Sequence, residues 1–163
     1  MSDRFTQELI DLLPRLRRYA LSLCRRSDLA DDLVQITAER ALAARDRFDP
    51  ATRLPALLFR ILHNAWLDSL RRQKTRGAEV DIDDAQDARV VDGVAATEAR
   101  LMLQSTRAAM DRLPEDQRAV LMLVCVEELS YREAAEVLDI PVGTVMSRLA
   151  RARLALSALM GIN

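Results

Sequence analysis

Apolar residues recur every three to four positions along most of the chain, and this spacing predicts amphipathic α-helices. In the first half, the pattern predicts helices over residues 5–24, 28–46 and 54–76. Pro14 falls inside the first of them, where it can kink or split the helix. The third ends in the basic run LRRQKTR. The positions expected in a shared core include Leu16, Tyr19, Leu33, Leu42, Leu62 and Trp66.

The second half carries a separate helical pattern. A helix is predicted over residues 96–112, and Leu113-Pro114 ends it because proline cannot continue a helix. The next helix is expected to begin at Glu115 or Asp116. In the first half of the chain, the second helix is expected to be capped by Ser27 or Asp28. The core positions expected after residue 115 are Val120, Leu121, Leu123, Val124 and Val126.

Residues 130–156 show the pattern of a helix-turn-helix DNA-binding motif. Ser130 followed by Glu133 predicts a capping box at the start of the first helix. Asp139 suits the left-handed backbone of a sharp turn, and Pro141 prevents the first helix from continuing.

The second helix of this motif is expected to begin at Gly143 or Thr144. Its predicted buried stripe is Val145, Leu149, Ala152 and Leu156. Its predicted polar face is Ser147, Arg148, Arg151 and Arg153. From Thr144 to the end of the chain there are three arginines and no acidic residue, which favours contact with phosphate. The alternative is an ordinary helical hairpin with a solvated basic face.

The composition agrees with an all-α fold. Half of the 163 residues are hydrophobic but only six are aromatic, and four glycines and five prolines leave little room for the turns of a β-sheet protein. The chain has no apolar run long enough to span a membrane and no signal-peptide pattern, so we expect a cytoplasmic protein without membrane insertion. Cys24 and Cys125 lie in apolar helical patterns and are expected to be buried thiols, with a redox or disulfide role as the alternative.

The charges are distributed unevenly, although the net charge is only −1. Residues 1–76 carry 15 basic and 10 acidic side chains, whereas residues 77–100 carry 2 basic and 7 acidic ones. Since phosphate binding depends on charge within roughly 8 Å, the net value is a poor guide to nucleic-acid binding. We predict two small helical domains, 1–76 and 96–163, joined by a flexible acidic linker over 77–95.

The sequence offers little that points to an enzyme. It contains no CxxC, no HExxH and no glycine-rich phosphate loop, and its paired carboxylates are adjacent rather than convergent. His63 is the only histidine and cannot by itself form a metal site or a catalytic dyad, so it is interpreted as a surface or DNA-facing residue. No catalytic residue, metal site or cofactor is expected.

Three blocks of the chain, in this order, resemble the extracytoplasmic-function (ECF) sigma factors of bacterial RNA polymerase. The blocks are DLADDLVQITAERALAARDRF, LPALLFRILHNAWLDSLRRQKTR and LPEDQRAVLMLVCVEELSYREAAEVLDIPVGTVMSRLARAR. The resemblance implies a domain that docks on the polymerase and melts and reads the −10 promoter element. It implies a second domain that reads the −35 element.

The resemblance also implies residue roles. The residues matching the face that meets the β′ coiled coil of core polymerase are Asp31, Asp32, Gln35, Glu39 and Arg40. The candidates for the −10 element are Phe48, Asp49, Arg60, His63, Asn64, Asp68, Arg71 and Arg72. The candidates for the −35 element are Arg118, Tyr131, Arg132, Thr144, Ser147, Arg148 and Arg151. Met146 and Ala150 depart from the residues of some members, so no −35 base preference is carried over.

The partners implied by the resemblance are core RNA polymerase, through its β′ coiled coil and β flap, promoter DNA and an anti-sigma factor. A stress-response role is the corresponding expectation. Two alternatives remain at this point. The chain could be a homodimeric regulator that binds duplex DNA, or a sigma mimic that sequesters an anti-sigma factor. Without the resemblance, the polar face of residues 31–40 would be a solvated helix face with ion pairs.

Overall fold

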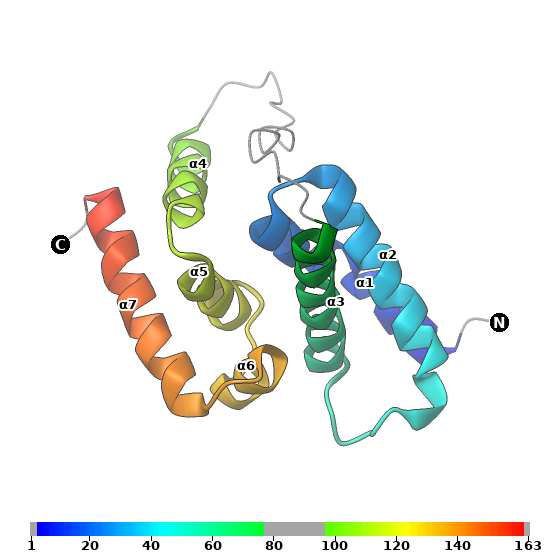
Figure 1. The fold of residues 1–163 in the computed structure, drawn as a ribbon. Helices are drawn as coiled ribbons and strands as arrows, with labels where there is room; N and C mark the ends of the chain where they lie inside the picture. The colour runs from blue at the N-terminus through cyan, green and yellow to red at the C-terminus, as the bar shows by residue number, and fades with distance from the viewer. Residues whose placement is uncertain (1–2, 77–96, 162–163) are drawn as a thin grey trace. The chain divides into compact units, whose positions relative to one another are not determined.

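The computed structural model describes residues 3–76 and 97–161, and these residues form helices and connecting turns without a strand (Figure 1). Their contacts divide them into two compact units. The first unit contains the first three α-helices; the second contains α4, α5, α7 and the start of α6. The predicted all-α class is confirmed. The predicted linker over 77–95 lies outside the described residues, so the proposed domain boundaries stay a prediction.

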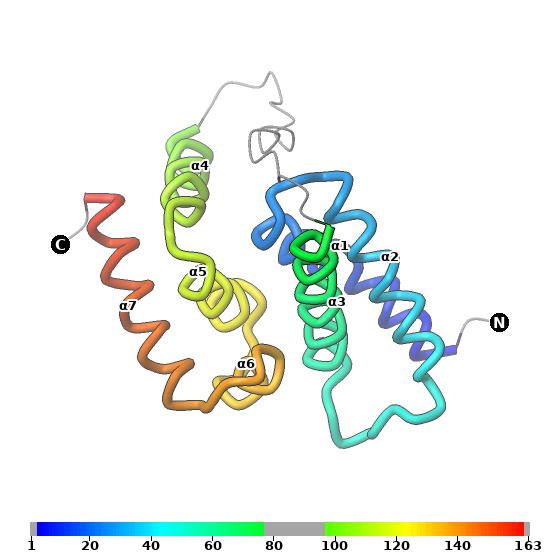
Figure 2. Tube along the Cα trace, in the orientation of Figure 1, coloured from blue at the N-terminus to red at the C-terminus, as the bar shows by residue number. Residues whose placement is uncertain are grey.

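The first unit is a bundle of α1 (Arg4–Cys24), α2 (Ser27–Ala43) and α3 (Leu54–Arg76), each packed against the other two (Figure 2). Trp66 is buried here, as predicted. Leu42 is 45% exposed, so its assignment to the core was wrong. The buried stripe of α2 is narrow, and Leu42 points away from it because each helical residue turns about 100° from the last. The buried residues of α2 are Ala30, Leu33, Thr37 and Ala41.

Helix α1 continues unbroken through Pro14. Proline removes the N–H that would bond to the carbonyl of Ile10, and Ile10 is on the exposed side of the helix, where water can hydrate that carbonyl. The predicted cap of α2 was wrong. Its N-cap is Arg26 and makes no side-chain cap bond, because Ser27 and Asp28 are already inside the helix. Asp28 instead pairs with Arg26 at 2.7 Å.

The second unit is built from α4 (Glu98–Asp111), α5 (Glu115–Leu121), the start of α6 (Tyr131–Leu138) and α7 (Val142–Met160), with α4 and α5 both contacting α7. A single π-helical turn, Met122–Val126, follows α5. Because a π turn adds a residue to the helical repeat, it changes which side chains face inward. Val126 and Cys125 are therefore exposed, and both predictions of burial were wrong.

Cys24 differs from Cys125 in its surroundings. It is half-buried, and its Sγ donates to the carbonyl of Arg26 at 3.3 Å. Burial raises the pKa of the Cys24 thiol above its ordinary value, since the thiolate would lose solvation. The side chain is thus a protonated thiol at neutral pH, which disfavours a reactive role.

The helix-turn-helix is confirmed in detail. The Ser130 amide donates to Glu133 Oε1 at 2.9 Å, and the Glu133 amide donates to Ser130 Oγ at 3.0 Å, which is the reciprocal capping box. Asp139 has a left-handed φ of 54°. Helix α7 begins at Val142, slightly before the predicted start, because Pro141 serves as its N-cap residue. Val145, Leu149 and Ala152 are buried as expected, whereas Leu156 is half-buried.

Candidate nucleic-acid interface

One face of α3 gathers most of the residues predicted to meet the −10 element. Arg60, Asn64, Asp68 and Arg71 follow one another at steps of four, four and three residues, so they form one stripe along the helix. Arg72 lies beside it, and the arginines and Asn64 are exposed. The structure therefore presents guanidinium and amide donors together on one side of the first unit, a chemistry suited to phosphate oxygens and base edges.

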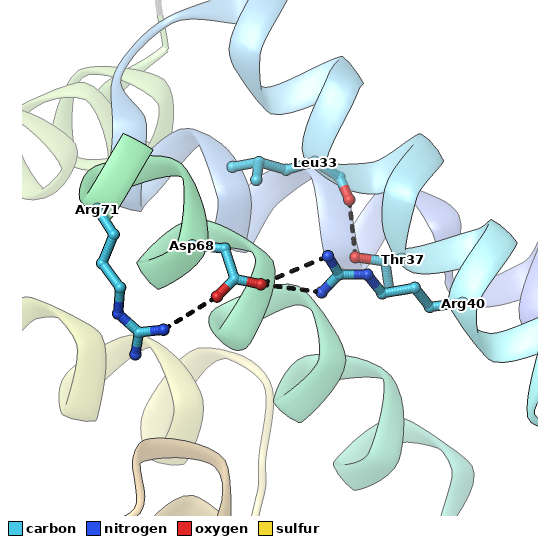
Figure 3. A network of polar contacts seen from close by, with 5 residues as sticks. All are labelled: Leu33, Thr37, Arg40, Asp68 and Arg71. Atoms are coloured by element: carbon cyan, nitrogen blue, oxygen red, sulfur yellow. Dashed lines mark hydrogen bonds and ion pairs between the residues drawn. The ribbon is translucent and has the colours of Figure 1, made fainter. Parts of the chain in front are cut away.

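Asp68 is held between two arginines (Figure 3). Its Oδ2 accepts from Nη1 and Nη2 of Arg40 on α2, both at 3.4 Å, and its Oδ1 accepts from Arg71 Nη1 at 3.2 Å. These contacts are partly exposed, so their contribution to stability is small. A carboxylate would repel DNA phosphate, and its place between Arg40 and Arg71 suits it to orienting those side chains.

His63 is a correction to the expected surface position. It is only 9% exposed, and its Nδ1 lies 3.1 Å from the hydroxyl of Tyr19 on α1. The physical reason is its place in the buried stripe of α3, with Phe59, Leu62 and Trp66. The sequence spacing indicates this stripe, because His63 follows Phe59 by four residues and precedes Trp66 by three, which places the three side chains on one helix face. His63 therefore joins α1 to α3 and does not face DNA.

The loop between α2 and α3 is ordered by its own polar groups. A 3-10 turn, Arg45–Arg47, follows α2. Asp49 Oδ1 then accepts from the Ala51 amide at 2.9 Å, and the Asp49 carbonyl accepts from the Thr52 amide at 2.9 Å. Such an Asx turn closes the loop locally. Phe48 and Asp49, both predicted −10 contacts, thus lie in a compact segment next to α3.

The start of α1 reaches this loop through contacts that the sequence analysis missed. Asp3 Oδ2 lies 2.6 Å from Nη1 of Arg45, and the ring of Phe5 meets that of Phe48 edge-on at 5.7 Å between centroids. Hydrogen bonding to the Thr6 amide, with Arg45 nearby, holds the pKa of Asp3 below its ordinary value. No local sequence signal links residues 3 and 45, so only the fold shows this pairing.

The outer face of α2 carries acidic and amide side chains that are all exposed. Asp31 pairs with Arg17 of α1 at 2.8 Å, and Gln35 Nε2 donates to Glu39 Oε1 at 3.2 Å. Asp32, the next residue after Asp31, is also exposed. This face carries three exposed carboxylates, Asp31, Asp32 and Glu39, whereas arginines predominate on the face of α3. Arg40, the fifth predicted polymerase contact, is also exposed on α2, but it pairs with Asp68 of α3.

The polar residues of α7 differ in their solvent exposure. Ser147 and Arg151 are exposed, whereas Arg148 is half-buried and its Nε lies 3.7 Å from Asp116 Oδ2 on α5. Ser147 Oγ donates to the Thr144 carbonyl at 3.2 Å. Tyr131 and Arg132 are exposed in the first turn of α6. Of the two α7 arginines predicted to meet the −35 element, Arg148 and Arg151, only Arg151 is exposed and in no ion pair among the described residues, so it is the more available to DNA.

Arg118 is a second correction. It was predicted to grip phosphate, but it is 5% exposed. Its Nη1 donates to the carbonyls of Leu113 at 3.0 Å and Asp111 at 3.3 Å, at the end of α4. The last carbonyls of a helix lack intrahelical partners and carry partial negative charge, so a buried guanidinium satisfies them. Arg118 therefore fastens α5 to the end of α4 and is not a DNA contact.

Comparison with known proteins gives the family. The Sigma-70 region 2 family matches residues 9–76, and the Sigma-70, region 4 family matches residues 103–156. The ECF RNA polymerase sigma factor EcfG of Rhodopseudomonas palustris is 40% identical over 163 residues, covering 100% of this chain and 88% of that protein. The chain belongs to the ECF sigma factors. It is thus a transcription initiation factor that directs promoter-specific initiation.

Solved sigma factors share its fold. The sigma factor RpoE in complex with the anti-sigma factor NepR, from Bartonella quintana, superposes with a TM-score of 0.77 at 34% identity, covering 98% of each chain. CnrH in complex with the cytosolic domain of CnrY gives a TM-score of 0.67 at 30% identity, covering 96% of this sigma factor and 87% of that chain. In this sigma factor, none of the helices in the described ranges is long and apolar enough to cross a membrane.

Proposed function

We propose that this sigma factor binds core RNA polymerase through the outer face of α2, reads the −10 element with α3 and its preceding loop, and reads the −35 element with α7. The observation that carries the proposal is the segregation of charge by face. The acidic face of α2 avoids DNA phosphate and suits a protein partner, whereas arginines gather on α3 and on α7.

The −10 contacts are assigned to the stripe of α3. Opening duplex DNA costs about 1.4 kcal/mol of stacking per base step, and captured single-stranded bases offset that cost. Arg60, Arg71 and Arg72 supply charge for the backbone, while Asn64 supplies an amide for a base edge. The aromatic side chains of α3, Phe59 and Trp66, are buried, which favours capture of a single extruded base over stacking of many bases.

The −35 contacts are assigned to the exposed face of α7 and the start of α6. Arg151 and Ser147 face outward for base edges or phosphates in the major groove. Arg148 pairs with Asp116, Thr144 lies in the first turn of α7, and Tyr131 and Arg132 lie in the first turn of α6. The second unit is also proposed to bind the β flap of the polymerase.

The proposal includes regulation by an anti-sigma factor and a role in a stress response. It is supported by two similar structures, in which RpoE is bound to the anti-sigma factor NepR and CnrH is bound to the cytosolic domain of CnrY. Exposed apolar side chains, among them Leu101, Met102 and Leu103 of α4, offer surface for such a protein partner.

Reversing the charge of Asp32 tests the polymerase contact. We expect Asp32→Arg to raise the Kd of the full chain for core RNA polymerase about tenfold or more, because an unfavourable charge at an interface costs several kcal/mol. Asp32 is preferred to Asp31, since Asp31 already pairs with Arg17. The measurement is competition against fluorescently labelled wild-type chain. Asp11→Arg, an exposed reversal on α1, is the matched control and should change the Kd less than twofold.

Equal affinities for the two variants would contradict the assignment of α2. The same assay separates the sigma factor from a decoy, because a decoy would bind an anti-sigma factor but fail to bind core polymerase. A homodimeric duplex-DNA regulator would likewise show no polymerase binding and would elute as a dimer.

A further inference from the structure

The first residues of α1 make two separate contacts with the loop between α2 and α3. The two carboxylate oxygens of Asp3 have different partners. Its Oδ1 caps α1 by accepting from the Thr6 amide at 2.8 Å, and its Oδ2 pairs with Nη1 of Arg45 at 2.6 Å. The carboxylate that fixes the start of α1 therefore also holds the beginning of the loop.

The second contact is aromatic. The rings of Phe5 and Phe48 lie edge to face, with centroids 5.7 Å apart and planes at 66°. This geometry is the favoured one for aromatic pairs, because the positive ring edge meets the negative ring face. Phe5 follows Asp3 by two residues and Phe48 follows Arg45 by three, so the ionic and aromatic contacts join the same two segments.

These contacts act on the loop of residues 44–53, where the backbone hydrogen bonds within the 3-10 turn and the Asp49 turn are local ones. Residues 44–53 contain one 3-10 turn and are otherwise irregular. A loop that must adopt one shape to bind loses conformational entropy, and fixing that shape beforehand improves affinity without adding any contact to the ligand.

We propose that Asp3 and Phe5 are positioning residues that hold the α2–α3 loop in the conformation that meets single-stranded −10 DNA. The inference rests on the proposed function, which assigns Phe48 and Asp49 to that element. Neither Asp3 nor Phe5 contacts the DNA. The start of α1 acts through Arg45 and Phe48, and so links the first residues of the chain to promoter recognition.

The test uses the full chain bound to core polymerase. The probe is a fluorescein-labelled single-stranded 12-mer, selected from a randomised pool by the wild-type holoenzyme. Asp3→Asn keeps a good helix cap but removes the charge, while Arg45→Gln removes the pair and leaves the cap untouched. Each should weaken probe binding about three- to tenfold, and Phe5→Leu similarly, as expected for loss of preorganisation. The double variant Asp3→Asn/Arg45→Gln should bind no more weakly than either single variant.

Arg4→Gln is the matched control, because it breaks the exposed pair of Arg4 with Glu8 in the same turn without touching the loop. It should bind the probe like wild type. All variants should keep the wild-type affinity for core polymerase. The variants of Asp3, Arg45 and Arg4 should also unfold within about 2 °C of wild type, since exposed ion pairs contribute little to stability. That separation distinguishes positioning from a general structural role.

Wild-type probe affinity in Asp3→Asn and Phe5→Leu would overturn the inference while leaving the proposed function intact. Parallel losses of probe binding, polymerase affinity and unfolding temperature would overturn it too, because the contacts would then be merely structural. If the wild-type holoenzyme itself selected no single-stranded sequence, the proposed −10 function would fail, and the inference with it.

Discussion

With Arg151 replaced by alanine, the sigma factor should produce about 10- to 100-fold less run-off transcript from a promoter that depends on its −35 element. Arg151 is exposed on α7 and, among the described residues, is in no ion pair. An arginine forked onto guanine contributes roughly 1–3 kcal/mol of discrimination, and 1.4 kcal/mol corresponds to tenfold in binding. If Arg151 contacts phosphate, the fold loss should shrink as the salt concentration rises, because the variant has one charged contact fewer and its binding depends less steeply on salt.

Arg153→Ala supplies the control for that experiment. Arg153 is also exposed on α7, but it follows Arg151 by two residues, about 200° around the helix, and its Nη2 lies 3.9 Å from Cys125 Sγ. The prediction that placed both arginines on one polar face was therefore wrong for Arg153. Its removal should lower transcription less than threefold. Similar losses in both variants would indicate general charge rather than a specific contact, and normal transcription by Arg151→Ala would remove Arg151 from the interface.

A second large effect is expected at Arg118, in stability and not in DNA contact. Arg118→Ala should lower the free energy of unfolding of the second unit by about 2–4 kcal/mol, because two carbonyls at the end of α4 lose their donor and a large buried side chain is removed. Urea unfolding of the full chain, followed by far-ultraviolet circular dichroism, measures the change.

The exposed Arg107 of α4 gives the comparison for Arg118. Arg107→Ala should change the free energy of unfolding by less than about 0.5 kcal/mol, as is usual for surface substitutions. Wild-type stability in Arg118→Ala, accompanied by weaker binding to −35 DNA, would contradict the burial-based account and restore the phosphate contact first expected from the sequence.

Features set by neighbouring residues were predictable from the sequence. The capping box of Ser130 and Glu133, the left-handed Asp139 and the buried stripe of α7 all depend on groups within a few positions of one another. The helix-turn-helix followed from them. The same locality explains why the polar stripe of α3 was identified, since its members recur at helical spacing.

Features set by packing or by irregular helix geometry were missed. Residue type favoured a surface place for His63 and Arg118, but both are buried. The partner of His63, Tyr19, is 44 residues away, and the guanidinium of Arg118 bonds to the backbone carbonyls of Leu113 and Asp111, which no side-chain pattern indicates. The π turn at Met122–Val126 follows no simple period, so the sequence could not indicate that Val126 would turn outward and Glu127 inward. The pairing of Asp3 with Arg45 spans 42 residues and has no local signature.

Run-off transcription with purified bacterial core polymerase tests the central claim most directly. The templates are a promoter selected by the holoenzyme from a randomised library and the same DNA with its −35 and −10 segments scrambled. The account predicts a discrete transcript from the intact promoter that requires both the chain and the core enzyme, and at least tenfold less from either scrambled template. Equal transcription with and without the chain, or from intact and scrambled templates alike, would contradict it.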